Sequence, residues 1–150
     1  MAAWHLDTNH LGAAVKPVSP IREKIERAYR NGERIGTCLP VICEWQAGIQ
    51  ELKRKESYRQ TVRILLRTVR IWPLDVGTTE RYGEVFQELR KRGKALSQVD
   101  MMVAALARQM GLTVLTSDKD LTGYRPHRRR SAPPRRGEDA RQLRPSARTI

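Results

Sequence analysis

The segment Ala3-Trp4-His5-Leu6-Asp7-Thr8-Asn9 gives the clearest indication of the fold class of this chain. Its first four residues are a short, mainly apolar run that predicts a strand, and a helical stretch over 9–15 follows it. In an open parallel sheet, ligands bind beyond the carboxyl ends of the strands. Asp7 is therefore expected at the ligand-binding edge of the sheet.

The rest of the chain alternates strands with helices. Apolar spacing and the positions of Gly, Pro and Asn predict strands over 34–39, 69–74 and 113–116, and helices over 20–31, 41–55, 57–68, 79–92 and 97–109. This alternation predicts an α/β fold with one central, mostly parallel sheet. The length of 150 residues suits a single domain with a sizeable core.

The same spacing predicts which side chains face the core. The expected inward positions are Ile42, Trp45, Ile49 and Leu52 in the helix over 41–55, and Tyr82, Val85, Phe86 and Leu89 in the helix over 79–92. The two cysteines, Cys38 and Cys43, are too few for a disulfide framework and lack the spacing of a zinc site. Both are expected to be reduced core thiols.

Positive charge is concentrated at one end of the chain. Of the formal net charge of +13, residues 1–124 contribute 20 Lys and Arg against 14 Asp and Glu, and residues 125–150 contribute 9 Arg against 2 acids. The division predicts a folded domain over 1–124 and a disordered Arg- and Pro-rich tail over 125–150. The tail is interpreted either as a contact for nucleic acid or an acidic partner, or as a solvated extension. No apolar run is long enough for a membrane span and no secretory signal is present, which predicts a cytoplasmic protein.

Four acidic residues stand in apolar surroundings within this basic chain. They are Asp7, Glu44 after Pro40-Val41-Ile42-Cys43, Asp100 within 99–105, and Asp118 after 113–116. Carboxylates are rarely buried without a partner, because the loss of hydration costs several kcal/mol. A divalent cation is the most economical partner for all four. Mg²⁺ and Mn²⁺ prefer oxygen ligands, and a bound cation would let an acidic pocket hydrolyse the phosphodiester of a nucleic acid.

Each acid also has a simpler structural interpretation. Asp7 is a possible N-cap, and Ser97-Gln98-Val99-Asp100 matches a capping box. Glu44 is a possible surface residue beside the apolar stripe of its helix, and Asp118 with Asp120 suits a polar turn. Spacing along the chain does not decide whether the fold gathers the four acids.

These motifs, taken in order, resemble the PIN domain family. The resemblance rests on Leu6-Asp7-Thr8-Asn9, on 40–44 with Gly48, on 97–100 with the alanines at 104, 105 and 107, and on Thr113 to Leu121. Their order and spacing are similar to the VapC toxins of type II toxin–antitoxin modules. The resemblance covers residues 3–124. The chain departs from the family pattern at Leu121, where an aromatic residue is usual, and in lacking a final apolar strand after Asp120.

The resemblance implies a three-layer α/β/α fold and an endoribonuclease that depends on Mg²⁺ or Mn²⁺. Asp7, Asp100 and Asp118 would be the metal ligands, and Glu44 would orient or deprotonate the attacking water or serve as a further ligand. Thr116 or Ser117 would be a supporting polar group. The implied partners are structured RNA, often tRNA, a second copy in a homodimer, and a cognate antitoxin that inserts a segment near the acidic pocket.

Two other functions fit the same residues. The first is a catalytically inactive PIN-like protein that binds RNA or an antitoxin-like partner through its basic surface. The second is a nuclease of related fold that acts on DNA. RNA cleavage that depends on a divalent cation separates the leading interpretation from the first, and a comparison of single-stranded DNA with structured RNA separates it from the second.

Overall fold

The computed structural model describes residues 1–116 of the chain, so Asp118, Asp120 and the tail over 125–150 lie outside the described residues. Four strands form one parallel sheet in the order β3-β2-β1-β4. The strands are β1 (Ala3–Leu6), β2 (Arg34–Cys38), β3 (Arg70–Trp72) and β4 (Thr113–Leu115). The predicted α/β fold with a central parallel sheet is confirmed.

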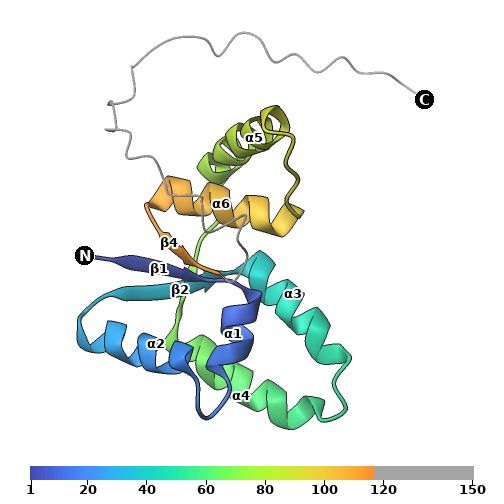
Figure 1. Ribbon diagram of the computed structural model, residues 1–150. Coiled ribbons are helices and arrows are strands. Elements are labelled where there is room, and N and C mark those ends of the chain that lie inside the picture. The colour runs from blue at the N-terminus through green and yellow to red at the C-terminus, as the bar shows by residue number, and fades with distance from the viewer. Residues whose placement is uncertain (117–150) are drawn as a thin grey trace.

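Six helices surround the sheet in the described part of the chain. They are α1 (Thr8–Ala14), α2 (Pro20–Arg30), α3 (Leu39–Gln50), α4 (Lys55–Thr68), α5 (Val76–Lys91) and α6 (Gln98–Met110). Figure 1 shows α5 and α6 on one side of the sheet and α1 to α4 on the other, which makes three layers. Within residues 1–116, no helix is both long enough and apolar enough to cross a lipid bilayer.

Local sequence signals explain where most helices begin. Asp7 caps α1, and Ser19 caps α2 with Pro20 at the first helical position. Ser97 caps α6, whose end is marked by Gly111 at a φ of 67°. In α5 the helix begins at Val76 rather than at the predicted Thr79, because Asp75 and Thr78 cap each other reciprocally.

The main core lies between the sheet and its helices. It includes Leu6, Leu11, Ile35, Val41 and Leu106, all at most 2% exposed. A second, smaller cluster between α5 and α6 contains Val85, Leu89, Met101, Ala104 and Ala105. The α5–α6 pair is therefore held together by its own apolar contacts, while α6 also packs on β4.

The indole of Trp72 lies against the sheet at Gly36. Its Nε1 donates a hydrogen bond to the carbonyl oxygen of Trp4, 3.3 Å away, so the ring reaches from β3 across β2 to β1. A Cβ atom at Gly36 would lie 2.6 Å from Trp72 Nε1 and 2.5 Å from the carbonyl oxygen of Arg70. Only glycine leaves room for this arrangement.

Several predicted core positions are wrong. The helix predicted over 41–55 ends at Gln50, which leaves Leu52 41% exposed, and its buried face carries Val41 rather than Ile42. Phe86 is 48% exposed because α5 packs mainly against α6, and Val85 and Leu89 fill the cluster between the two helices. Cys38 is a buried thiol as expected, whereas Cys43 is exposed.

Candidate active site

Asp7 lies where β1 ends and α1 begins. Its backbone N–H donates to the carbonyl oxygen of Leu115 on β4, 3.3 Å away, which continues the strand pairing by one residue. Its Oδ1 accepts hydrogen bonds from the backbone N–H and the Nδ1 of His10, both at 2.8 Å. The N-cap interpretation of Asp7 is therefore confirmed. Its Oδ2 accepts no hydrogen bond from residues 1–116, so one carboxylate oxygen stays available to a ligand.

Glu44 reaches the same corner from α3. The hydroxyl of Thr8 donates a hydrogen bond of 2.9 Å to Glu44 Oε2, although the two residues are 36 positions apart. Glu44 is exposed, as its structural interpretation expected, yet it lies directly beside the turn that carries Asp7. Glu44 is therefore joined through Thr8 to the residue that directly follows Asp7.

Asp100 lies in the first turn of α6, and its side chain is half-buried. Its backbone N–H donates to Ser97 Oγ at 3.1 Å, and Ser97 Oγ donates back to Asp100 Oδ2 at 2.7 Å. The predicted capping pair is present, although Asp100 accepts from the side chain of Ser97 rather than from its backbone. No hydrogen bond within residues 1–116 joins Asp100 to Asp7 or Glu44.

The strand that precedes Asp118 in the sequence lies beside β1. β4 pairs with β1 so that Leu6 lies opposite Leu115, and Asp118 follows Leu115 by three residues. The chain thus enters the segment of Asp118 from the strand beside Asp7, at the same edge of the sheet. Asp118 itself, with Ser117, lies outside the described residues, and its role stays a prediction.

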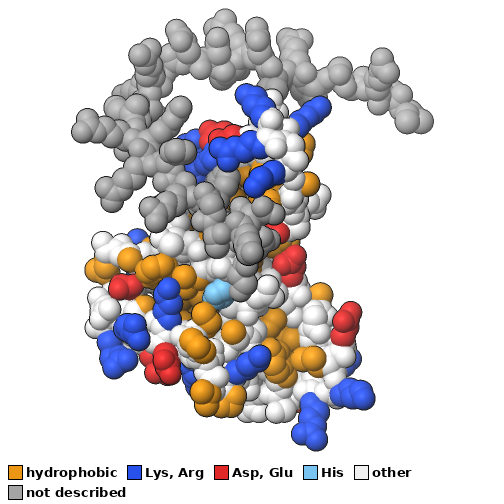
Figure 2. Space-filling view, in the orientation of Figure 1, with side chains coloured by type: hydrophobic (Ala, Val, Ile, Leu, Met, Phe, Trp, Pro, Cys, Tyr) orange, Lys and Arg blue, Asp and Glu red, His pale blue; other side chains and the backbone are white. Residues whose placement is uncertain are grey.

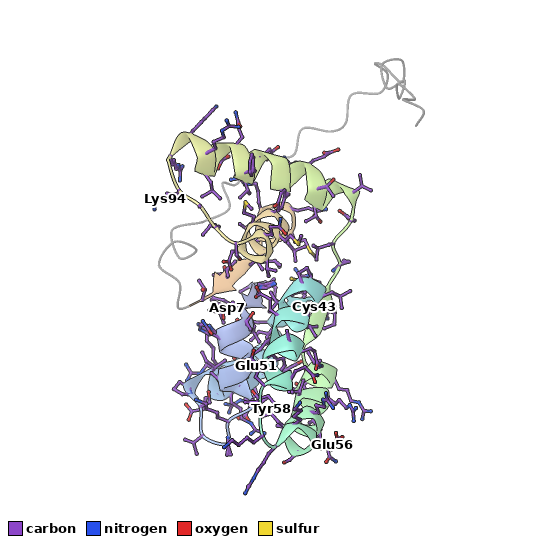
Figure 3. The ribbon with its side chains drawn as sticks, turned by 90° about the vertical axis from the view of Figure 1, so that its right-hand side faces the viewer. Asp7, Cys43, Glu51, Glu56, Tyr58 and Lys94 are labelled. Carbon is purple, nitrogen blue, oxygen red and sulfur yellow. The ribbon has the colours of Figure 1, made fainter. Side chains whose placement is uncertain are left out.

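Figure 3 shows Asp7 between the α5–α6 pair and the helices of the opposite layer, with Cys43 marking the nearby part of α3. Within residues 1–116, no three His, Cys, Asp or Glu side chains approach closely enough to hold a metal ion. The nearby oxygen donors are carboxylates and the Thr8 hydroxyl, a set that suits a hard divalent cation. The unengaged Oδ2 of Asp7 fits such a cation, and Asp100 and Asp118 are the residues that would complete the set.

Two histidines near Asp7 carry no role in the sequence interpretation. His10 orients the Asp7 carboxylate from one turn into α1, a contact suggested only by its spacing of three residues from an N-cap. His5 lies fully buried on β1, and neither of its ring nitrogens has a hydrogen-bond partner among residues 1–116. Burial lowers the pKa of His5 to about 4, against the opposing effect of Asp7, so the ring is neutral near pH 7.

An apolar cavity of about 210 Å³ lies elsewhere, between α2 and α4. Its lining includes Ile25, Tyr29, Ile64 and Leu65, and none of the three acids in the described part of the chain contributes to it. The polar corner beside Asp7, rather than this cavity, is the candidate for phosphodiester chemistry.

Comparison with known proteins agrees with this geometry. The PIN domain family model matches residues 5–125, and the chain belongs to this family. Ribonuclease VapC2 of Rickettsia felis is 28% identical over 116 residues, which cover 77% of this chain and 86% of the relative.

Solved structures show the same fold. The crystal structure of VapBC2 from Rickettsia felis, bound to a DNA fragment from its promoter, has a TM-score of 0.74 at 24% identity and covers 81% of this chain and 92% of that one. Mycobacterium tuberculosis VapC20, described as a sarcin–ricin loop cleaving toxin, has a TM-score of 0.58 at 16% identity and covers 81% and 94%. The three-layer VapC-type PIN fold is thus confirmed.

Proposed function

We propose that this chain is an endoribonuclease that depends on Mg²⁺ or Mn²⁺ and acts as the toxin of a type II toxin–antitoxin module. The observation that carries the proposal is the corner where Asp7 ends β1 and Glu44 is joined to the adjacent Thr8. Asp100 and Asp118 are proposed as the further acids of the site. The family membership and the ribonuclease relative support the reaction class.

The proposed mechanism assigns a task to each side chain. Asp7, Asp100 and Asp118 would hold the cation, which when bound neutralises the phosphodiester and lowers the pKa of water. Glu44, exposed beside Thr8, would orient the attacking water and take its proton, or serve as a further ligand. Water attacks phosphorus, one P–O bond of the RNA breaks, and the leaving oxygen takes up a proton. His10 would hold the Asp7 carboxylate in place.

Removal of the metal tests this function. Purified protein should cleave structured RNA, such as total tRNA, in Mg²⁺ or Mn²⁺, and EDTA should abolish the cleavage, because carboxylates alone repel the phosphate backbone. Restoring the cation should restore the activity. A DNA-acting nuclease would instead prefer single-stranded DNA.

A second candidate is an inactive PIN-like protein that binds RNA or an antitoxin. Such binding needs only a basic surface, and the exposed side chains of Arg90, Lys91 and Arg92 provide one within residues 1–116. RNA binding that persists in EDTA, without cleavage at any Mn²⁺ concentration, would replace the first proposal with this one.

An antitoxin partner is proposed from the structural neighbours, several of which are VapBC complexes. In this chain the antitoxin would block the reaction by covering the corner of Asp7 and Glu44. Co-purification with the product of the adjacent open reading frame, with loss of RNA cleavage in the complex, is the expected result.

A homodimer is proposed from exposed apolar residues at one end of the sheet. Leu39 is 62% exposed directly after β2, and Leu74 and Val76, 36% and 77% exposed, follow the neighbouring β3. Parallel pairing of Cys38 with Trp72 places these segments at the same edge. Apolar side chains exposed together in this way mark interaction surfaces.

The double variant Leu39→Asp/Val76→Asp should therefore shift the chain from dimer to monomer in light scattering, since charges in an apolar interface lose their hydration. Val18→Asp is the control, because Val18 is 89% exposed in the loop before α2 and should leave the dimer intact. A wild-type chain that is monomeric at all concentrations would contradict the proposal.

A further inference from the structure

The end of α5 carries a dense group of positive charge. We call this group the basic turn; its members, all exposed, are Arg90, Lys91, Arg92 and Lys94. Gly93, which lies between Arg92 and Lys94, has a φ of 63°. Figure 2 shows Lys and Arg side chains gathered at the end of the molecule that α5 occupies in Figure 1.

Three arginine and lysine side chains of the basic turn, Arg90, Lys91 and Arg92, differ from the other arginines of the α5–α6 pair. Arg81 pairs with Glu84 at 2.6 Å, and Arg108 pairs with Glu88 at 2.8 Å. In contrast, Arg90, Lys91 and Arg92 make no ion pair with any residue in 1–116. Cations near a helix C-terminus interact favourably with the helix dipole, but this effect fades within the last turn and does not explain a basic run that continues to Lys94.

The basic turn is joined to the candidate active site by a short stretch of chain. From Lys94 the chain runs directly to Ser97, which caps α6 and bonds the side chain of Asp100. Figure 3 shows Lys94 on the same side of the molecule as Asp7. An extended polyanion held by this turn would therefore pass along the side of the molecule where the acids lie.

A second basic surface provides a comparison. Lys55, Arg63 and Arg67 are exposed on α4, and they too form no ion pair within the described residues. However, α4 leads into the start of β3, at the amino-terminal edge of the sheet, whereas Asp7 lies at the carboxyl edge. Charge alone does not distinguish the two surfaces, but their position relative to the acids does.

We infer that the basic turn binds the sugar–phosphate backbone of the RNA substrate beside the scissile bond. The inference rests on the proposed ribonuclease function and adds where the substrate lies. Lys and Arg that neutralise phosphates release condensed counterions, so their contribution is read from the salt dependence of binding. Because such contacts carry no base information, they affect different RNA sequences equally.

The test compares two triple variants with the same loss of charge. Arg90→Gln/Lys91→Gln/Arg92→Gln removes the basic turn, and Lys55→Gln/Arg63→Gln/Arg67→Gln removes the α4 surface. Both are made in the wild type for RNA cleavage and in Asp7→Asn for binding to labelled total tRNA. Circular dichroism and the melting temperature establish that each variant is folded.

The basic-turn variant should raise the Kd for tRNA at least about tenfold near physiological salt, and should lower the slope of log Kd against log salt by about 2 to 3. It should raise KM for cleavage while kcat at saturating RNA stays near that of the wild type. The α4 variant should change the Kd, the slope and KM by less than about twofold.

Equal losses in both variants, or unchanged binding in the basic-turn variant, would overturn the inference while wild-type cleavage still supports the ribonuclease proposal. Failure of the wild type to cleave RNA in Mg²⁺ or Mn²⁺ would overturn the proposed function separately. A wild-type chain that neither binds nor cleaves tRNA would overturn both.

Discussion

Replacing Asp7 with Asn is expected to lower kcat for RNA cleavage by at least about a hundredfold while the protein stays folded. The charge of Asp7 is proposed to hold the cation, and even residues that only orient metal ligands cost 10- to 100-fold when removed. Asn caps helices as well as Asp, so an amide oxygen can still accept the backbone N–H of His10. Asp7→Ala should lose both the proposed metal ligand and the helix cap, and the lost cap should cost about 1 kcal/mol of stability.

Asp75→Asn is the matched control for Asp7→Asn. Asp75 also caps a helix directly after a strand, and its Oδ1 accepts from the backbone N–H of Thr78 at 3.0 Å. Hydrogen bonds from Gln109 and Thr78 lower the pKa of Asp75, so its carboxyl group is negatively charged near neutral pH. It lies after β3, two strands away from β1. Cleavage should survive in Asp75→Asn, and equal loss in both variants would contradict the special role of Asp7.

Gly36→Ala is expected to destabilise the protein by about 3 kcal/mol or more, at the upper end of overpacking effects. The new Cβ would lie 2.5 Å from the carbonyl oxygen of Arg70 and 2.6 Å from Trp72 Nε1. The carbonyl belongs to the neighbouring strand, so relief requires β2 and β3 to separate or the indole to leave its place against the sheet. The melting temperature should fall by roughly 10 °C in calorimetry.

Gly48→Ala makes the same chemical change without the clash. Gly48 is within α3, and a Cβ there would meet no atom within 4 Å. Ala is favoured over Gly in a helix interior by roughly 0.5–1 kcal/mol, so this variant should be slightly more stable than the wild type. A Gly36→Ala protein as stable as Gly48→Ala would mean that the indole of Trp72 does not lie against Gly36 in solution.

The order of strands and helices was accessible from sequence because it depends on local signals. The strand Ala3–Leu6 and the helix Pro20–Arg30 agree with apolar runs and with Ser19-Pro20. Phe86 shows where such signals fail. Helical spacing predicts Phe86 in the core. However, α5 packs mainly against α6, so fewer of its apolar side chains are buried than in a helix that lies on the sheet.

The candidate site, too, was only partly predictable from the sequence. Chain order and fold class predict that Asp7 lies at the end of a strand. They do not predict the bond between Thr8 and Glu44, because it joins residues 36 positions apart through the packing of α1 on α3. The clash that excludes Ala at Gly36 depends likewise on Trp72, which belongs to another strand. Contacts of this kind exist only in the assembled fold.

A titration of the protein with Mn²⁺, followed by calorimetry or electron paramagnetic resonance, tests the proposed metal site most directly. The wild type should show a saturable Mn²⁺ site that is lost or at least tenfold weaker in Asp7→Asn, Asp100→Asn and Asp118→Asn, and unchanged in Asp75→Asn. Mn²⁺ binding that is equally strong in all five proteins would contradict the claim that these acids form one metal site.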